Sequence, residues 1–369
     1  MIIRINPKED TKMKKTLIFA LIAVLLLGLC ACASNSEGTA APVSTAAQDT
    51  APETQASAPQ TTDPKAETEA PAQEGVELNV YSLKGPTSMG LVTLLEDSKN
   101  GKTYNTYHST MCTAADEVTA ALINGSADIA LLPANAAATL YNKAGGFSVV
   151  GINTLGVLYV LEKGDTVQSL ADLAGKTVYL TGKGTVPEFS LRYVLAAAGI
   201  EDQVTLEFKS EPQEVVEAMN ADVANIGLLP QPFVTAALAQ NEGLRIALSL
   251  TEEWGKLTQD SSFITGVTVV RNEILEKYPE QVKAFLAESA VGVETVNQHP
   301  EIAAPLIEAL GIVAKAPLAQ KAIPFCNLVC ITGQEMKDQL SGYLQTLFDQ
   351  NPKAVGGAMP ADEFYYTGE

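Results

Sequence analysis

Four short segments place glycine, proline, lysine or threonine directly after a run of apolar residues. Two of them, VYSLKGPTSMG (80–90) and VYLTGKGTVPE (178–188), contain a Lys-Gly pair followed by a threonine. The other two, ADIALLPANAAATL (127–140) and ANIGLLPQPFVTAAL (224–238), contain Leu-Leu-Pro. Glycine lets a backbone approach a ligand closely, and polar side chains at helix N-termini lie beside unpaired N–H groups that favour anions. These residue types indicate binding rather than catalysis.

The four segments form an internal repeat, because the two Leu-Leu-Pro segments are about 97 positions apart and the two Lys-Gly segments about 98. Each half is predicted to hold one strand ending in Lys-Gly and a later strand ending in Leu-Leu-Pro, each followed by a helix. Ligands of open α/β sheets bind beyond the carboxyl ends of the strands. Two such halves would surround one cleft with four loops, and the expected ligand-binding residues are Lys84, Gly85, Pro86, Thr87, Ser88, Met89, Pro133, Asn135, Lys183, Gly184, Thr185, Pro230, Gln231 and Phe233.

A simpler interpretation of these residues stays open. Thr87, Thr185 and Asn135 could merely cap helices, and Pro133 and Pro230 could merely begin them. Lys84 and Lys183 could point to solvent instead of to an anionic ligand. Phe233 and Trp254 could stack on a flat ligand such as a pyrimidine, but Trp254 by itself is better explained as a structural residue.

Catalytic and metal-binding residue types are scarce. The chain has two histidines, His108 and His299, far apart in sequence, so no multi-histidine metal site and no cofactor are expected. GxSxG, HExxH and Walker-type motifs are absent from the sequence. We expect His299 on the surface at a helix end and His108 on a strand, facing either core or cleft. A spatial catalytic triad that uses one of them stays open.

Composition and periodicity predict an α/β fold. Hydrophobic residues make up 46% of the chain, enough for a large core, and a net charge of −19 argues against nucleic-acid binding. Short apolar runs alternate with helical patterns, which predicts parallel or mixed sheets covered by helices. The last hundred residues are mostly helical in pattern. The predicted strands are 76–83, 103–109, 127–133, 147–153, 156–162, 176–182, 204–209, 224–230, 244–250 and 266–272.

The N-terminal region has the pattern of an export signal and a tether. Lys14 and Lys15 precede the short apolar run TLIFALIAVLLLGLCACA, so residues 1–31 are predicted to be a signal peptide, with Met13 as a possible true start. Cys32 follows a small residue and matches the lipidated cysteine of a bacterial lipobox, whereas Cys30 follows Leu29 and fits poorly. A plain secretory signal is the alternative. Residues 32–75 lack leucine, isoleucine and aromatic residues and are predicted to be a disordered tether.

Three cysteines follow the tether, namely Cys112, Cys326 and Cys330. Cys326 and Cys330 are poorly spaced for a disulfide on either a strand or a helix. We therefore expect all three to be free thiols that pack as small core residues.

Two stretches resemble the solute-binding proteins of ABC importers, in the branch of the nitrate, sulfonate, taurine and thiamine-precursor binders. One is SLADLAGKT (169–177) with YLTGKGTVPEFSLRYVLAAAGI behind it, and the other is the stretch 264–304, which begins ITGVTVVRNEILEKYPEQ. The resemblance covers residues 76–369. It implies a bilobed α/β type II periplasmic-binding-protein fold whose chain crosses between lobes near residues 160 and 250, with lobe 1 at 76–160 and 250–369 and lobe 2 at 161–249.

The same resemblance implies a function without catalytic residues. The protein is expected to be a monomeric extracytoplasmic lipoprotein, anchored to the cell membrane through Cys32. It would capture a small anionic or heteroaromatic organic solute and deliver it to an ABC permease. The alternatives are an extracytoplasmic enzyme on the same fold and a wall or adhesion module.

Overall fold

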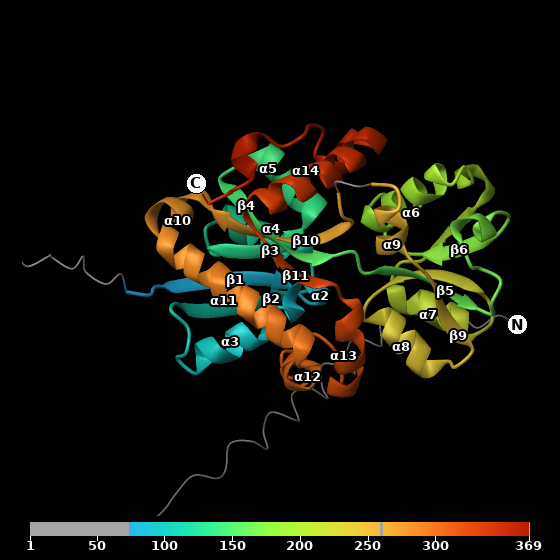
Figure 1. Cartoon of the computed structure of the whole chain (residues 1–369), viewed down its shortest axis with the longest axis horizontal. Coiled ribbons are helices and arrows are strands. Elements are labelled where there is room, and N and C mark those ends of the chain that lie inside the picture. Colours follow the sequence, from blue (N-terminus) through green and yellow to red (C-terminus); the bar gives the residue numbers. More distant parts are fainter. Residues whose placement is uncertain (1–73, 259–260, 369) are drawn as a thin grey trace, which may run out of the picture. The chain divides into compact units, whose positions relative to one another are not determined.

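The computed structural model describes residues 74–258 and 261–368, and these residues form two mixed β-sheets with helices around them (Figure 1). The predicted signal peptide, Cys32 and nearly all of the predicted tether lie outside the described residues. The first sheet has the order β11-β4-β10-β3-β1-β2, with β1 Glu77–Leu83, β2 Thr106–Cys112, β3 Ile129–Pro133, β4 Phe147–Leu155, β10 Ile264–Arg271 and β11 Leu328–Ile331. The second sheet has the order β7-β6-β8-β5-β9, with β5 Leu158–Lys163, β6 Thr177–Leu180, β7 Thr205–Phe208, β8 Ile226–Pro230 and β9 Leu244–Ser249.

The internal repeat of the sequence is a repeat of strand topology. In the first sheet, β1 is parallel to both β2 and β3, and β10 is antiparallel to β3. In the second sheet, β6 is parallel to both β7 and β8, and β5 is antiparallel to β8. Each repeated loop therefore follows a strand of a parallel pair, so the two loops of one sheet leave from the same edge.

Helices cover both sheets. The colours of Figure 1 show from which part of the chain each strand and helix comes. The first sheet combines early strands with β10 and β11 from late in the chain, whereas the second sheet is built from one continuous middle segment. The α-helices are α2 Pro86–Met89, α3 Val92–Lys99, α4 Ala115–Ile123, α5 Ala134–Ala144, α6 Val186–Ala197, α7 Pro212–Asn220, α8 Phe233–Gln240, α9 Leu250–Gly255, α10 Asn272–Lys277, α11 Pro279–Gln298, α12 Pro300–Ala309, α13 Ala316–Ala322 and α14 Gly333–Gln350. Short 3-10 turns occupy η1 Leu170–Leu173, η2 Glu201–Gln203, η3 Ile323–Phe325, η4 Pro352–Val355 and η5 Asp362–Phe364. None of the helices in the described part of the chain is both long and apolar enough to span a membrane.

The chain passes between the sheets twice, and the two passages touch at Gly156. This glycine lies between β4 and β5, and its carbonyl accepts hydrogen bonds from Asn327 Nδ2 at 2.5 Å and from Thr251 Oγ1 at 3.0 Å. Thr251 belongs to the return passage between β9 and β10. A Cβ on Gly156 would lie under 3.0 Å from both Thr251 Oγ1 and Phe263 Cδ1. The absence of a side chain thus lets the two passages pack directly on each other.

Most of the predicted elements are confirmed, with three differences. The segment SMGLVTLLEDS (88–98) has a continuous helical pattern but is divided between α2 and α3, and Gly90 between them lies so close to α11 that a Cβ would be 2.9 Å from Val293 Cγ2. Strand β2 begins and ends later than predicted, since its pairing with β1 runs from Thr106 to Cys112. The preceding Asn105 is buried, and its side chain accepts a hydrogen bond from Val76 N and donates one to Gln281 O. The last hundred residues, expected to be mostly helical, also contain strand β11. This strand pairs with β4 and forms an edge of the first sheet.

Candidate functional site

The loop between β1 and α2 is held together by its own side chains. Thr87 is buried and its hydroxyl donates to Leu83 O at 3.4 Å, while the fully buried Ser88 hydroxyl donates to Leu83 O and is hydrogen-bonded to the Ser82 hydroxyl at 2.8 Å. Gly85 precedes α2 with a φ of 139°, a conformation that favours glycine. Lys84 is exposed. The loop therefore presents its backbone and Lys84 outward and keeps its hydroxyls inside.

Below this loop the structure is closely packed. Thr87 borders a cavity of ≈ 20 Å³ that Asn153 and Thr268 also line, which is room for about one water molecule. Met89 is fully buried, and its Sδ lies 3.6 Å from Cys326 Sγ. Among the predicted contact residues of this loop, Met89 therefore serves core packing.

The loop between β6 and α6 is more exposed. Lys183, Gly184 and Thr185 are all exposed, and the Thr185 hydroxyl donates to Gly182 O at 2.6 Å. The Glu188 carboxylate accepts a hydrogen bond from Gly184 N at 2.7 Å and another from Arg192 Nε at 2.8 Å. A carboxylate of the chain itself thus occupies the N-terminal end of α6.

Glu188 stays ionised in this position. Burial alone would raise its pKa, but the hydrogen bonds from Gly184 N and Arg192, with the charge of Arg192, lower the pKa below its usual value. The sequence interpretation did not assign Glu188 a role. The signal was present in the Thr-x-x-Glu spacing of Thr185 and Glu188, which is typical of a helix N-terminus.

The two Leu-Leu-Pro junctions are built alike. Pro133 is the last residue of β3, and Pro230 is the last residue of β8. Asn135 lies in the first turn of α5, and Phe233 lies at the start of α8. All four residues are half-buried. Neither α5 nor α8 has a side-chain hydrogen bond at its N-cap.

Gln231, which follows Pro230, is the most buried polar group at these junctions. Its side chain is 2% exposed and its Oε1 accepts from Thr235 Oγ1 at 2.8 Å. Its Nε2 has no hydrogen-bond partner within residues 74–258 and 261–368. The structure therefore groups the predicted residues in two sets, one at the strand ends of each sheet.

Both histidines lie on the surface, whereas Trp254 lies in the core. His299 lies on the surface between α11 and α12, as predicted, beside Glu301. His108 lies on a strand, as predicted, but not in the core: its side chain is 54% exposed on edge strand β2 and lies 3.5 Å from Glu77. Trp254 is fully buried among aromatic rings, which confirms a structural role. Within the described residues, no group of histidine, cysteine and acidic side chains could hold a metal ion.

The cysteine prediction is confirmed, since Cys112, Cys326 and Cys330 are free thiols. Cys326 is fully buried, and burial raises its pKa to about 12. A thiol with that pKa carries almost no reactive thiolate near neutral pH.

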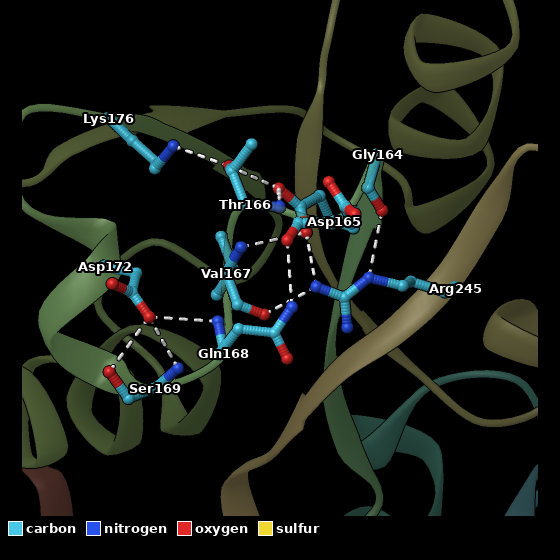
Figure 2. A network of polar contacts seen from close by, with 10 residues as sticks. Gly164, Asp165, Thr166, Val167, Gln168, Ser169, Asp172, Lys176 and Arg245 are labelled. Carbon is cyan, nitrogen blue, oxygen red and sulfur yellow. Dashed lines mark hydrogen bonds and ion pairs between the residues drawn. The ribbon is translucent and has the colours of Figure 1, made fainter.

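The segment SLADLAGKT, on which the resemblance partly rests, is part of a network of polar contacts (Figure 2). Asp172 accepts hydrogen bonds from Gln168 N, Ser169 N and Ser169 Oγ at 2.8 to 3.0 Å, which forms a capping box on η1. Val167 and Glu162, which precede this segment, are bound by Arg245. The Arg245 Nη2 group donates to Val167 O at 2.6 Å and to the Glu162 carboxylate at 2.7 Å.

Glu162 is the buried centre of this network, with 2% of its residue surface exposed. Burial would raise its pKa, but hydrogen bonds from the Thr166 side chain and from Val167 N and Thr166 N, with the charge of Arg245, lower it overall. The segment on which the resemblance partly rests therefore has a structural role beside the second sheet and is not part of the candidate site.

The chain is similar to one protein family in sequence and to solved ABC transporter proteins in structure. The model of the NMT1/THI5-like family matches residues 111–303, more than half of the 369 residues. An ABC transporter protein from Parabacteroides distasonis is 25% identical with a TM-score of 0.67, covering 78% of this chain and 98% of that one. No curated protein sequence matches the chain.

Two further solved structures show the same fold at lower identity. The periplasmic aliphatic sulphonate binding protein SsuA from Escherichia coli is 18% identical with a TM-score of 0.60, covering 77% of this chain and 92% of that one. The periplasmic nitrate-binding protein NrtA from Synechocystis is 15% identical with a TM-score of 0.50, covering 71% of this chain and 75% of that one. The fold is thus the bilobed α/β fold of type II periplasmic binding proteins.

Proposed function

The chain belongs to the NMT1/THI5-like family, and on that premise we propose that it is the solute-binding component of an ABC-type importer. It binds a small solute outside the cytoplasmic membrane and delivers it to a membrane permease. We propose binding without catalysis. The similar structures include an ABC transporter protein, a sulphonate binder and a nitrate binder, which support this class of function.

One observation carries the proposal, namely the repeated topology. Each sheet sends two loops from the carboxyl ends of neighbouring parallel strands, β1 and β3 in the first and β6 and β8 in the second. Ligands of α/β sheets bind at such ends. We propose that the first sheet with residues 76–160 and 250–369, and the second with residues 161–249, form two lobes that enclose the solute between these four loops.

We propose a small organic anion or a heteroaromatic compound as the solute. Lys84 and Lys183 are exposed at equivalent loops and can supply positive charge, and Lys183 Nζ lies 5.6 Å from the ring centre of Phe208. Glu188 already neutralises part of the positive end of α6. An anion is therefore expected to bind through the exposed lysines, on a loop that the Thr185 hydroxyl orders, more than through that helix end.

The proposed attachment follows from the sequence. Cys32 would be lipidated after cleavage of residues 1–31, and residues 32–75 would tether a monomeric domain to the membrane. Two or three acyl chains anchor a protein stably, whereas a single chain binds only marginally.

The test is a thermal-shift panel of nitrate, alkanesulfonates, small carboxylates and pyrimidines on the purified domain. A bound solute raises stability by RT ln(1 + [L]/Kd). For any solute that binds, Thr185→Ala should weaken affinity by about 1 kcal/mol, roughly fivefold in Kd, because the hydroxyl that orders the loop is lost.

Thr185→Ser is the matched control, because it keeps the hydroxyl and should bind within twofold of the unmodified domain. Thr185 is exposed, so neither variant should affect folding. Full affinity in Thr185→Ala, or the absence of any binder in a broad panel, would count against the proposed site.

A further inference from the structure

Two Asn-Gly pairs follow helices beside the first sheet and have nearly the same backbone conformation. Asn100 follows α3 with φ −91° and ψ 5°, and Asn124 follows α4 with φ −84° and ψ 0°. The glycines behind them both have a positive φ, 68° at Gly101 and 80° at Gly125. All four residues are exposed. The two pairs therefore differ little in sequence, in backbone conformation or in access to water.

Hydrogen bonds hold the first pair on both sides of the Asn-Gly bond. Gly101 N donates to Ser98 O at 3.0 Å. The side-chain amide of Asn100 is also held, because its Nδ2 donates to Glu96 O at 2.7 Å and to Glu96 Oε1 at 3.1 Å. Any reaction that moves Gly101 N or the Asn100 amide must first break these bonds.

The second pair has a different set of hydrogen bonds. Gly125 N and Asn124 Nδ2 have no hydrogen-bond partner within residues 74–258 and 261–368. The Asn124 side chain instead accepts a hydrogen bond at Oδ1 from Ser126 N, at 2.9 Å. A hydrogen bond to an amide oxygen draws electrons away from the carbonyl carbon. Asn124 thus combines a polarised Cγ, an unbound leaving group and an unbound neighbouring nitrogen.

We propose that Asn124 is a site of spontaneous deamidation in the folded protein, and that Asn100 is protected. Gly125 N attacks Asn124 Cγ and loses its proton to water, so that a new N–C bond closes a succinimide ring. The Cγ–Nδ2 bond breaks, and Nδ2 takes up a proton and leaves as ammonia. A water molecule then opens the ring at one of its two carbonyl carbons, which gives either aspartate or isoaspartate. Water is the only co-reactant, and nothing is oxidised or reduced.

The product changes the connection between α4 and β3. Ala127 N donates to Ala121 O at 3.0 Å across this turn, and Arg271 Nε donates to Ala127 O at 3.0 Å. Isoaspartate adds one carbon to the main chain inside the turn, and either product places a negative charge at the C-terminal end of α4, which is unfavourable. This inference does not depend on solute binding and can be tested if the proposed function is wrong.

The experiment incubates the folded protein in mildly alkaline buffer and follows both pairs in the same samples. A protease that cuts before aspartate releases residues 97–115 with Asn100 and residues 116–127 with Asn124 as separate peptides. Mass spectrometry measures deamidation of each against a sample taken before incubation. Asn124 is expected to react about tenfold faster than Asn100 or more, because Asn100 must lose the hydrogen bonds of Gly101 N and of its own amide.

Two controls separate the fold from the sequence. The same incubation in guanidinium chloride removes the hydrogen bonds that distinguish the pairs, so both should then react at rates within about twofold of each other. The variant Asn124→Gln keeps an amide but forms a cyclic imide far more slowly, and it should remove the mass change from the peptide 116–127.

Three results would overturn the proposal. Equal rates of the two pairs in the folded protein would show that these hydrogen bonds do not control the reaction. Reaction of Asn124 only in guanidinium chloride would show that the folded turn protects it. A rate difference that persists unchanged in guanidinium chloride would show that the sequence around each pair, and not the fold, sets the rate.

Discussion

Replacing Gly156 by alanine tests whether the two passages between the sheets must touch. The added Cβ would lie under 3.0 Å from Thr251 Oγ1, from Phe263 Cδ1 and from Phe263 Cγ. Phe263 is almost fully buried, so the ring cannot turn away into solvent. Overpacking of this kind costs about 1 to 3 kcal/mol, and displacement of Thr251 would also lose its hydrogen bond to Gly156 O, which contributes about 1 kcal/mol.

We therefore expect Gly156→Ala to lower the free energy of unfolding by about 2 to 4 kcal/mol in urea denaturation followed by circular dichroism. Gly255→Ala is the control, because Gly255 is exposed in α9 and a Cβ there has no atom within 4 Å. This control should be neutral or slightly stabilising, since alanine is the better helix former. A change below about 0.5 kcal/mol in Gly156→Ala would refute the close contact of the two passages.

Three further predictions concern other parts of the chain. Arg245→Met leaves the buried Glu162 carboxylate without its cation and should cost about 3 kcal/mol in urea unfolding; the unmodified protein should lose the Glu162 contribution as pH falls below about 4.5, because folding lowers that pKa. Cys32→Ser should release the protein from membranes or block processing on fractionation, whereas Cys30→Ser should not. Native protein should show no thiol reaction at Cys326 at pH 8, and rapid reaction in urea.

The repeat and the strand periodicity predicted most of the fold. The segments 127–140 and 224–238 correspond to β3 with α5 and to β8 with α8, which occupy equivalent places in the two sheets. Local patterns suffice here because the apolar strand, the proline turn and the following helix are each encoded in consecutive residues, although the strands themselves pair with distant partners such as β10. Strand β11 could not be predicted in the same way, because it has four residues and depends on pairing with β4, far away in sequence.

The candidate site was predictable by position but not by side-chain direction. Thr87 and Thr185 occupy equivalent loops, yet one is buried and the other exposed. The difference arises from packing, since Gly266 lies against the Thr87 side chain and Asn153 lines the same small cavity, and no local pattern encodes these neighbours. The solute contacts of both loops remain predictions.

The most direct test of the central claim is small-angle scattering of the purified domain with and without a solute found in the thermal-shift panel. A solute that touches loops of both sheets binds a closed arrangement better than an open one and shifts the population toward it. The radius of gyration should therefore fall when the solute is added, and the fall should be absent in a solution of a compound that does not bind. Tight binding with an unchanged radius of gyration would contradict a site formed between the two sheets.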